Sequence, residues 1–192
     1  MIIWMIVLTI SVVAIILSAA SGDPSVHMVM TGFVSLAIAL LAIRENMQLR
    51  AAGAGRSAVS AATARYMGLV WLWGALSLLV TYMFILEWHE WWQFFLGFAA
   101  LGVLCLLLAT AIERDAESGR VDETVLDLTR YLAIGQLAGM LIAIIGLLID
   151  PTKRFLTIEV KDWAANNIFL FGAISLAAIT AHALIYDKKA AA

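Results

Sequence analysis

Six long apolar stretches fill most of the 192-residue chain, and almost no charged side chain interrupts any of them. A helix of roughly 20 apolar residues is long enough to cross the hydrocarbon core of a bilayer. Lipid offers no hydrogen-bond partner to a backbone group, so each stretch has to be helical. We therefore expect an all-α fold, a polytopic membrane protein built as a bundle of six transmembrane helices. The predicted spans are residues 2–20, 26–43, 66–86, 92–112, 131–149 and 164–186.

The composition excludes most soluble folds. Hydrophobic residues make up 64% of the sequence and charged residues 14%, whereas soluble domains are about 45–50% apolar and about 25% charged. A soluble fold of this size could not shield so much apolar surface from water. No linker rich in Pro, Gly or Ser divides the chain, so residues 1–192 are expected to form one domain. The sequence contains no basic patch of the kind that binds nucleic acid, so no nucleic acid is expected as a partner.

The distribution of Lys and Arg predicts the orientation. Nine of the 12 basic residues lie in loops 44–65 and 113–130 and in the tail after residue 186. The positive-inside rule then places both termini in the cytoplasm, with the protein integral to a cytoplasmic (inner) membrane. Ser18-Ala19-Ala20 resembles a signal-peptide cleavage site. However, the first basic residue is Arg44, so the positive n-region of a signal peptide is missing and we expect residues 2–20 to remain as a helix.

Two short patterns recur along the chain. Arg65-Tyr66 opens the third span, and Arg130-Tyr131 opens the fifth span 65 residues later. The second span ends Ala42-Ile43-Arg44-Glu45, and the fourth ends Ala111-Ile112-Glu113-Arg114. These recurrences indicate three successive helical hairpins. The alternative interpretation is that any membrane hairpin ends in interfacial Tyr and Arg.

The two connections predicted on the cytoplasmic side have different compositions. Residues 51–64 are small and weakly polar, and Gly53 and Gly55 favour a loop there over a helix packed on a partner. Residues 113–130 are expected to continue as helix from the fourth span or into the fifth. Asp122 and Glu123 would lie near a helix N-terminus, where the helix dipole favours acids.

The residues best suited to bind a metal lie at the predicted outer face. They comprise two imidazoles and three carboxylates: Asp23, His27, Glu87, His89 and Glu90. This set is large enough for a divalent metal, and His27 and His89 could instead hold a haem from its two sides. The favoured interpretation is simpler, because polar residues commonly solvate helix ends at an interface, and it requires no cofactor.

A second candidate site concerns helix packing. Gly135, Gln136, Gly139 and Gly146 share part of the fifth span, and Gly135-x3-Gly139 is a pattern that lets two helices approach closely. This face could serve packing within the chain or contact with another subunit. No Asp, Glu, Lys or Arg lies near the middle of any span, which argues against an ion-coupled transporter.

These features favour a non-catalytic accessory or structural subunit of a larger membrane complex. Its partners would be the lipid bilayer and another membrane protein or further copies of itself. Two alternatives stay open. One is a small channel or facilitator for a solute or ion, gated by apolar side chains. The other is a redox protein that uses a metal or haem at His27 and His89.

Overall fold

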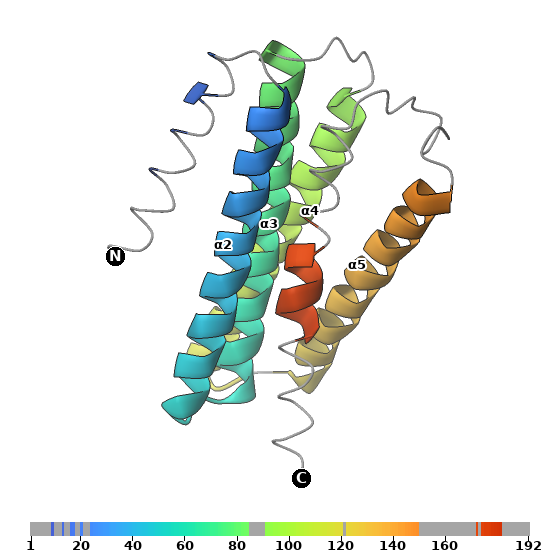
Figure 1. Cartoon of the computed structure of the whole chain (residues 1–192). Coiled ribbons are helices and arrows are strands. Elements are labelled where there is room, and N and C mark those ends of the chain that lie inside the picture. The colour runs from blue at the N-terminus through green and yellow to red at the C-terminus, as the bar shows by residue number, and fades with distance from the viewer. Residues whose placement is uncertain are drawn as a thin grey trace.

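The computed structural model describes residues 24–84, 91–120, 122–149 and 174–181, with isolated positions at 9, 13, 16–17, 20 and 172. The described part contains four long helices: α2 (Pro24–Ala51), α3 (Arg56–Phe84), α4 (Trp91–Glu117) and α5 (Glu123–Ile149). Residues 174–181 are also helical, and Leu176 and Ile179 pack into the core with α2 and α3. Successive long helices run up and down the bundle (Figure 1). The predicted all-α bundle is therefore confirmed.

All four long helices extend past their predicted apolar spans at the same end. α2 continues from residue 43 to Ala51, and α4 continues from residue 112 to Glu117. At that end α3 begins ten residues before residue 66 and α5 begins eight residues before residue 131. We call this the charged end. The loops predicted at 44–65 and 113–130 both lie there, as expected (Figure 1). The predicted spans 2–20 and 164–186 lie largely outside the described residues.

The loop predicted over residues 51–64 is wrong for most of its length. The connection is only 52–55, and residues 56–64 form the first turns of α3. Val59, Ala61, Ala62 and Ala64 are all buried, and Ala61 packs with residues of α4 and α5. Small side chains here allow α3 to lie close to its neighbours, so tertiary packing outweighs the turn signal of the glycines.

Local sequence determines where the helices stop and start at the charged end. Gly53 and Gly119 have positive φ values of 71° and 67°. At each, the backbone makes the paired hydrogen bonds of a Schellman cap, such as Gly119 N–H to Ala116 O at 3.1 Å and Arg120 N–H to Asp115 O at 2.9 Å. Asp122 and Glu123 lie at the N-terminus of α5, as predicted. Asp122 also caps the helix, because its Oδ1 accepts the N–H of Thr124 at 2.8 Å.

The closest helix pair is α3 and α4, which meet through glycines. A Cβ added to Gly68 would lie 2.9 Å from the carbonyl oxygen of Gly102. A Cβ added to Gly102 would lie 2.7 Å from Cγ of Leu72. Further along, a Cβ on Gly74 would lie 2.9 Å from the ring of Phe98. The two backbones can approach this closely only because these positions carry no side chain.

Length and composition mark one segment of the described chain, Phe95–Glu117, as able to cross a membrane. Apolar core helices of soluble proteins pass the same test, but those helices are mostly buried. Here only 28% of the most apolar window is buried inside the bundle.

Candidate functional site

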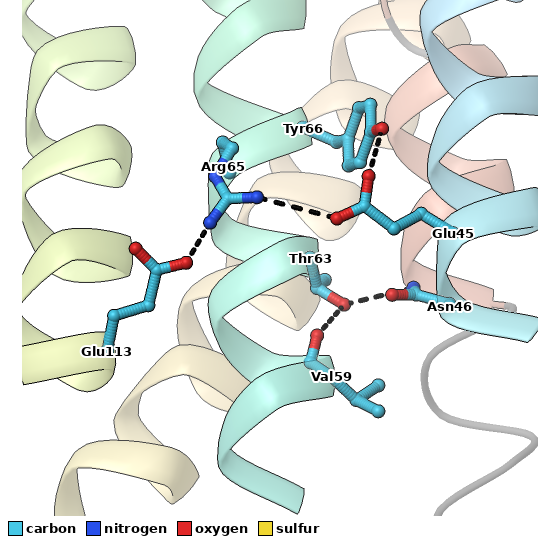
Figure 2. Close-up of polar contacts among 7 residues, drawn as sticks. All are labelled: Glu45, Asn46, Val59, Thr63, Arg65, Tyr66 and Glu113. Atoms are coloured by element: carbon cyan, nitrogen blue, oxygen red, sulfur yellow. Dashed lines mark hydrogen bonds and ion pairs between the residues drawn. The ribbon is translucent and has the colours of Figure 1, made fainter. Parts of the chain in front are cut away.

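A polar cluster joins three helices at the charged end (Figure 2). The two terminal nitrogens of Arg65 on α3 contact different partners. Nη1 lies 3.4 Å from Oε1 of Glu45 on α2, and Nη2 donates to Oε1 of Glu113 on α4. The planar guanidinium presents donors in fixed directions, so one Arg can hold two carboxylates at once. The cluster therefore connects α2, α3 and α4 through a single side chain.

Two further contacts extend the cluster between α2 and α3. The hydroxyl of Tyr66 donates to Oε2 of Glu45 at 2.5 Å, while the Tyr66 residue is 1% exposed. One residue along α2, Nδ2 of Asn46 donates to Oγ1 of Thr63 at 3.2 Å. The Thr63 hydroxyl in turn donates to the carbonyl of Val59 at 2.8 Å. The Tyr66 ring faces the core, and its hydroxyl fixes the Glu45 carboxylate.

Another arginine connects α3 to α5. Nη1 of Arg56 lies 2.6 Å from Oε2 of Glu123, and Nη2 lies 2.7 Å from Oδ1 of Asp127. Both acids stand in the first two turns of α5. Arg56 and Arg65 therefore have the same role, since each binds acids of neighbouring helices and holds the bundle together at its charged end.

A cleft of about 320 Å³ opens beside Arg65 between α2, α3 and α4. Its other lining residues are Leu49, three carboxylates and four small side chains: Glu45, Glu113, Glu117, Ser57, Ala58, Ala62 and Ala116. Arg65 contacts two of the three carboxylates and so ties α2 and α4 to α3, although its single positive charge against three negative charges leaves the lining with a net charge of −2. This arrangement suits holding helices together more than activating a substrate.

A second polar group lies deeper in the bundle. The indole Nε1 of Trp71 on α3 donates to Oε1 of Gln136 on α5 at 3.0 Å. Nε2 of the same amide lies 3.5 Å from Sγ of Cys105 on α4. The Trp71 ring also makes an edge contact with Phe98, with centroids 4.9 Å apart. Gln136 therefore bonds to α3 and α4 in a region otherwise filled by apolar side chains.

Of the residues predicted to pack helices, Gln136 is placed as described above. Gly135 is exposed, and an added Cβ there would meet no atom within 4 Å. Gly139 and Gly146 belong to α5, but their surroundings lie outside the described residues. Whether this face packs helices stays a prediction.

The predicted metal or haem site cannot be placed. Asp23, Glu87, His89 and Glu90 lie outside the described residues, and so does the side chain of His27, although its backbone is part of α2. In the part that the structure describes, no group of three or more His, Cys, Asp or Glu is arranged to hold a metal ion.

The recurring sequence patterns contained a signal for the Arg65 cluster, although we interpreted them as evidence of repeated hairpins. Its charged and aromatic members stand in the two recurring patterns noted above: Glu45, Arg65, Tyr66 and Glu113. The structure brings these four residues together, so the patterns also mark where helix ends are joined.

Comparison of the chain with protein-family models, with curated proteins and with solved structures gives no match.

Proposed function

We propose that this chain is a non-catalytic, multi-pass membrane protein that serves as a structural subunit of a larger membrane complex. In this proposal its six predicted spans cross an inner membrane, with the charged end of the bundle and both termini in the cytoplasm. The bundle supplies a rigid body, and its outward apolar faces meet lipid and a partner subunit.

The observation that carries this proposal is the outer face of α4. The exposed side chains between residues 96 and 111 include no charge: Leu96, Gly97, Ala100, Val103, Leu104, Leu107, Thr110 and Ala111. At 1.5 Å per residue this face is about 22 Å long. Leu107 alone is 61% exposed. Soluble monomers rarely expose a continuous apolar surface of this size, whereas lipid stabilises it.

Two other helices follow the same pattern. On α2 the exposed residues Phe33 and Leu40 precede the exposed Arg44. On α5 the exposed residues Tyr131 and Ile134 follow the partly exposed Arg130. In each case the apolar face ends where charge begins, and charge begins towards the same end of the bundle. A membrane surface crossing the bundle at that height accounts for this common boundary.

The polar side chains inside the bundle support a structural role. Arg65, Arg56 and Gln136 each contact two partners on neighbouring helices. Groups bound in this way stabilise one arrangement of helices, which is what a scaffold needs. A solute path would instead need polar groups directed into an open passage.

The test is gentle extraction of the full chain from its native membrane, followed by mass spectrometry of the intact assembly. We expect the chain to resist alkaline carbonate, to need detergent and to leave the membrane with one constant partner at fixed stoichiometry. In the variant Ala52→Cys, the introduced thiol should react with an impermeant maleimide only after cell lysis. Cys105 is fully buried and gives little background. A chain that stays soluble and monomeric without detergent would refute the proposal.

A further inference from the structure

Five of the seven arginines in the described bundle fall into two groups. Arg56 and Arg65 lie between helices, and each pairs with two carboxylates. Arg44, Arg114 and Arg130 form no ion pair within the described residues, and each is exposed or partly exposed. These three are the first basic residues beyond the exposed apolar faces of α2, α4 and α5. We call them the boundary arginines.

Contacts between the helices place the boundary arginines at one height. Glu45 and Glu113 both contact Arg65, so their neighbours Arg44 and Arg114 lie close to the level of Arg65. The level of Arg130 follows from the contact between α3 and α5. Trp71 of α3 donates to Gln136 of α5, and the two helices run in the same direction (Figure 1). Trp71 is six residues beyond Arg65, and Gln136 is six residues beyond Arg130. Arg130 therefore also lies close to the level of Arg65.

We propose that Arg44, Arg114 and Arg130 bind the phosphate groups of anionic glycerophospholipids in the cytoplasmic leaflet. This inference rests on the membrane location proposed above. Phosphates of one leaflet lie in one plane, and the three arginines share one level on three different helices. A guanidinium without a carboxylate partner can donate two parallel hydrogen bonds to a phosphate. The exposed apolar side chains on the membrane side of each arginine would contact the acyl chains of the same lipid.

The expected strength can be stated per residue. A basic side chain near an anionic membrane surface contributes about 1 kcal/mol, which corresponds to about a fivefold change in binding. The attraction falls off within a Debye length, about 8 Å at physiological ionic strength. Arg120 provides a matched control. It is exposed, it forms no ion pair among the described residues, and it lies in the turn after the last residue of α4, Glu117, beyond the level of Arg114.

The experiment measures lipid preference of the purified full chain by native mass spectrometry and by its thermal midpoint. The probes are phosphatidylglycerol and phosphatidylcholine. We expect the wild type to retain phosphatidylglycerol and to gain thermal stability from it relative to phosphatidylcholine. Each single variant, R44Q, R114Q or R130Q, should lose about fivefold in retained phosphatidylglycerol. R120Q should behave as wild type. The triple variant R44K/R114K/R130K should keep most of the preference for phosphatidylglycerol, because the positive charges stay.

Four outcomes would overturn the inference. The single variants could retain phosphatidylglycerol as the wild type does, or R120Q could lose it to the same extent, which would indicate net charge alone. Inorganic phosphate added in phosphatidylcholine could also reproduce the stabilisation, which would indicate a free-anion site. Circular dichroism confirms that each variant is folded. A wild type that inserts into phosphatidylcholine without preferring phosphatidylglycerol refutes only this inference, whereas a wild type soluble without detergent refutes the proposed membrane location as well.

Discussion

The charged end and the middle of the bundle hold their helices together in different ways. At the charged end, Arg56 and Arg65 connect helices through pairs of carboxylates that are partly open to solvent. In the middle, α3 and α4 touch through Gly68 and Gly102, and one neutral amide, Gln136, bonds to the neighbouring helices. Charge pairs cost little where water reaches them. In the proposed membrane location, the middle of the bundle would be surrounded by lipid, where helices depend on close packing and neutral hydrogen bonds.

The largest effect is expected from disturbing the packing in the middle. In Gly68→Ala the new methyl would lie 2.9 Å from the carbonyl oxygen of Gly102, which belongs to the backbone and cannot rotate away. The α3–α4 contact must therefore open, at a cost of about 3 kcal/mol. Thermal denaturation in detergent, followed by circular dichroism, measures the loss.

Gly97→Ala is the matched control for that substitution. Gly97 lies on α4, is exposed, and has no atom within 4 Å of an added Cβ. In a helix interior, Ala is favoured over Gly by about 1 kcal/mol, so this variant should be unchanged or slightly more stable. Equal losses in both variants would mean that the glycine contact does not determine the packing of α3 on α4.

The next largest effect is expected at the charged end. Arg65→Met removes the positive charge between Glu45 and Glu113 and leaves the two acids facing each other. All three side chains are one-third or more exposed, so water screens part of the loss, and we expect about 1–2 kcal/mol. Adding Glu113→Gln to Arg65→Met should restore part of the stability. A thermal-denaturation cycle of the four proteins measures this coupling.

Glu117→Gln is the control for the charged end. Glu117 lines the same cleft as Arg65 but forms no ion pair in the described structure. Its removal should change the free energy of unfolding by less than about 0.5 kcal/mol. If Glu117→Gln destabilised the protein as much as Arg65→Met, the total charge of the cleft would matter more than the geometry of the Arg65 cluster.

A smaller effect is expected from the neutral hydrogen bond in the middle. Gln136→Leu keeps the size of the side chain but removes the acceptor for Trp71 Nε1. Interhelical hydrogen bonds of this kind in membranes contribute about 0.6 kcal/mol on average. A cycle with Trp71→Phe isolates that contribution from the packing of the indole against Phe98. A coupling energy above that of the Arg65–Glu113 pair would reverse the expected order of the ion pair and the neutral hydrogen bond.

Sequence alone predicted the parts of the fold that depend on local patterns. The long apolar stretches locate α2 to α5, and Asp122 marks the start of α5. The start of α3 was missed because Gly53 and Gly55 resemble a loop. The alanines that follow favour a helix by their intrinsic propensity, and contacts of Ala61 with α4 and α5 stabilise it.

The candidate site was harder to predict because its members come from three helices. Arg65 and Glu113 are 48 residues apart, and no periodicity within one helix links them. Gly68 and Gly102 lie on different helices and form no small-x3-small pattern with each other, so their contact is visible only in three dimensions. Gly135, which does belong to such a pattern, has no neighbour at its Cβ position.

The smallest effect is expected at the start of α5, outside the apolar region. The backbone N–H of Thr124 donates to Asp122 and lowers the pKa of that carboxyl. Because the folded-state pKa lies below the unfolded value of about 3.9, the ionised cap stabilises the fold above that pH. This contribution disappears as the pH falls through the folded-state pKa. Asp122→Asn should retain the cap without titrating. The difference in thermal midpoint between wild type and Asp122→Asn should therefore change only below about pH 4, to the disadvantage of the wild type. A parallel response of both proteins down to pH 3 would show that other carboxylates, such as those bound to Arg56 and Arg65, control the acid sensitivity of the charged end.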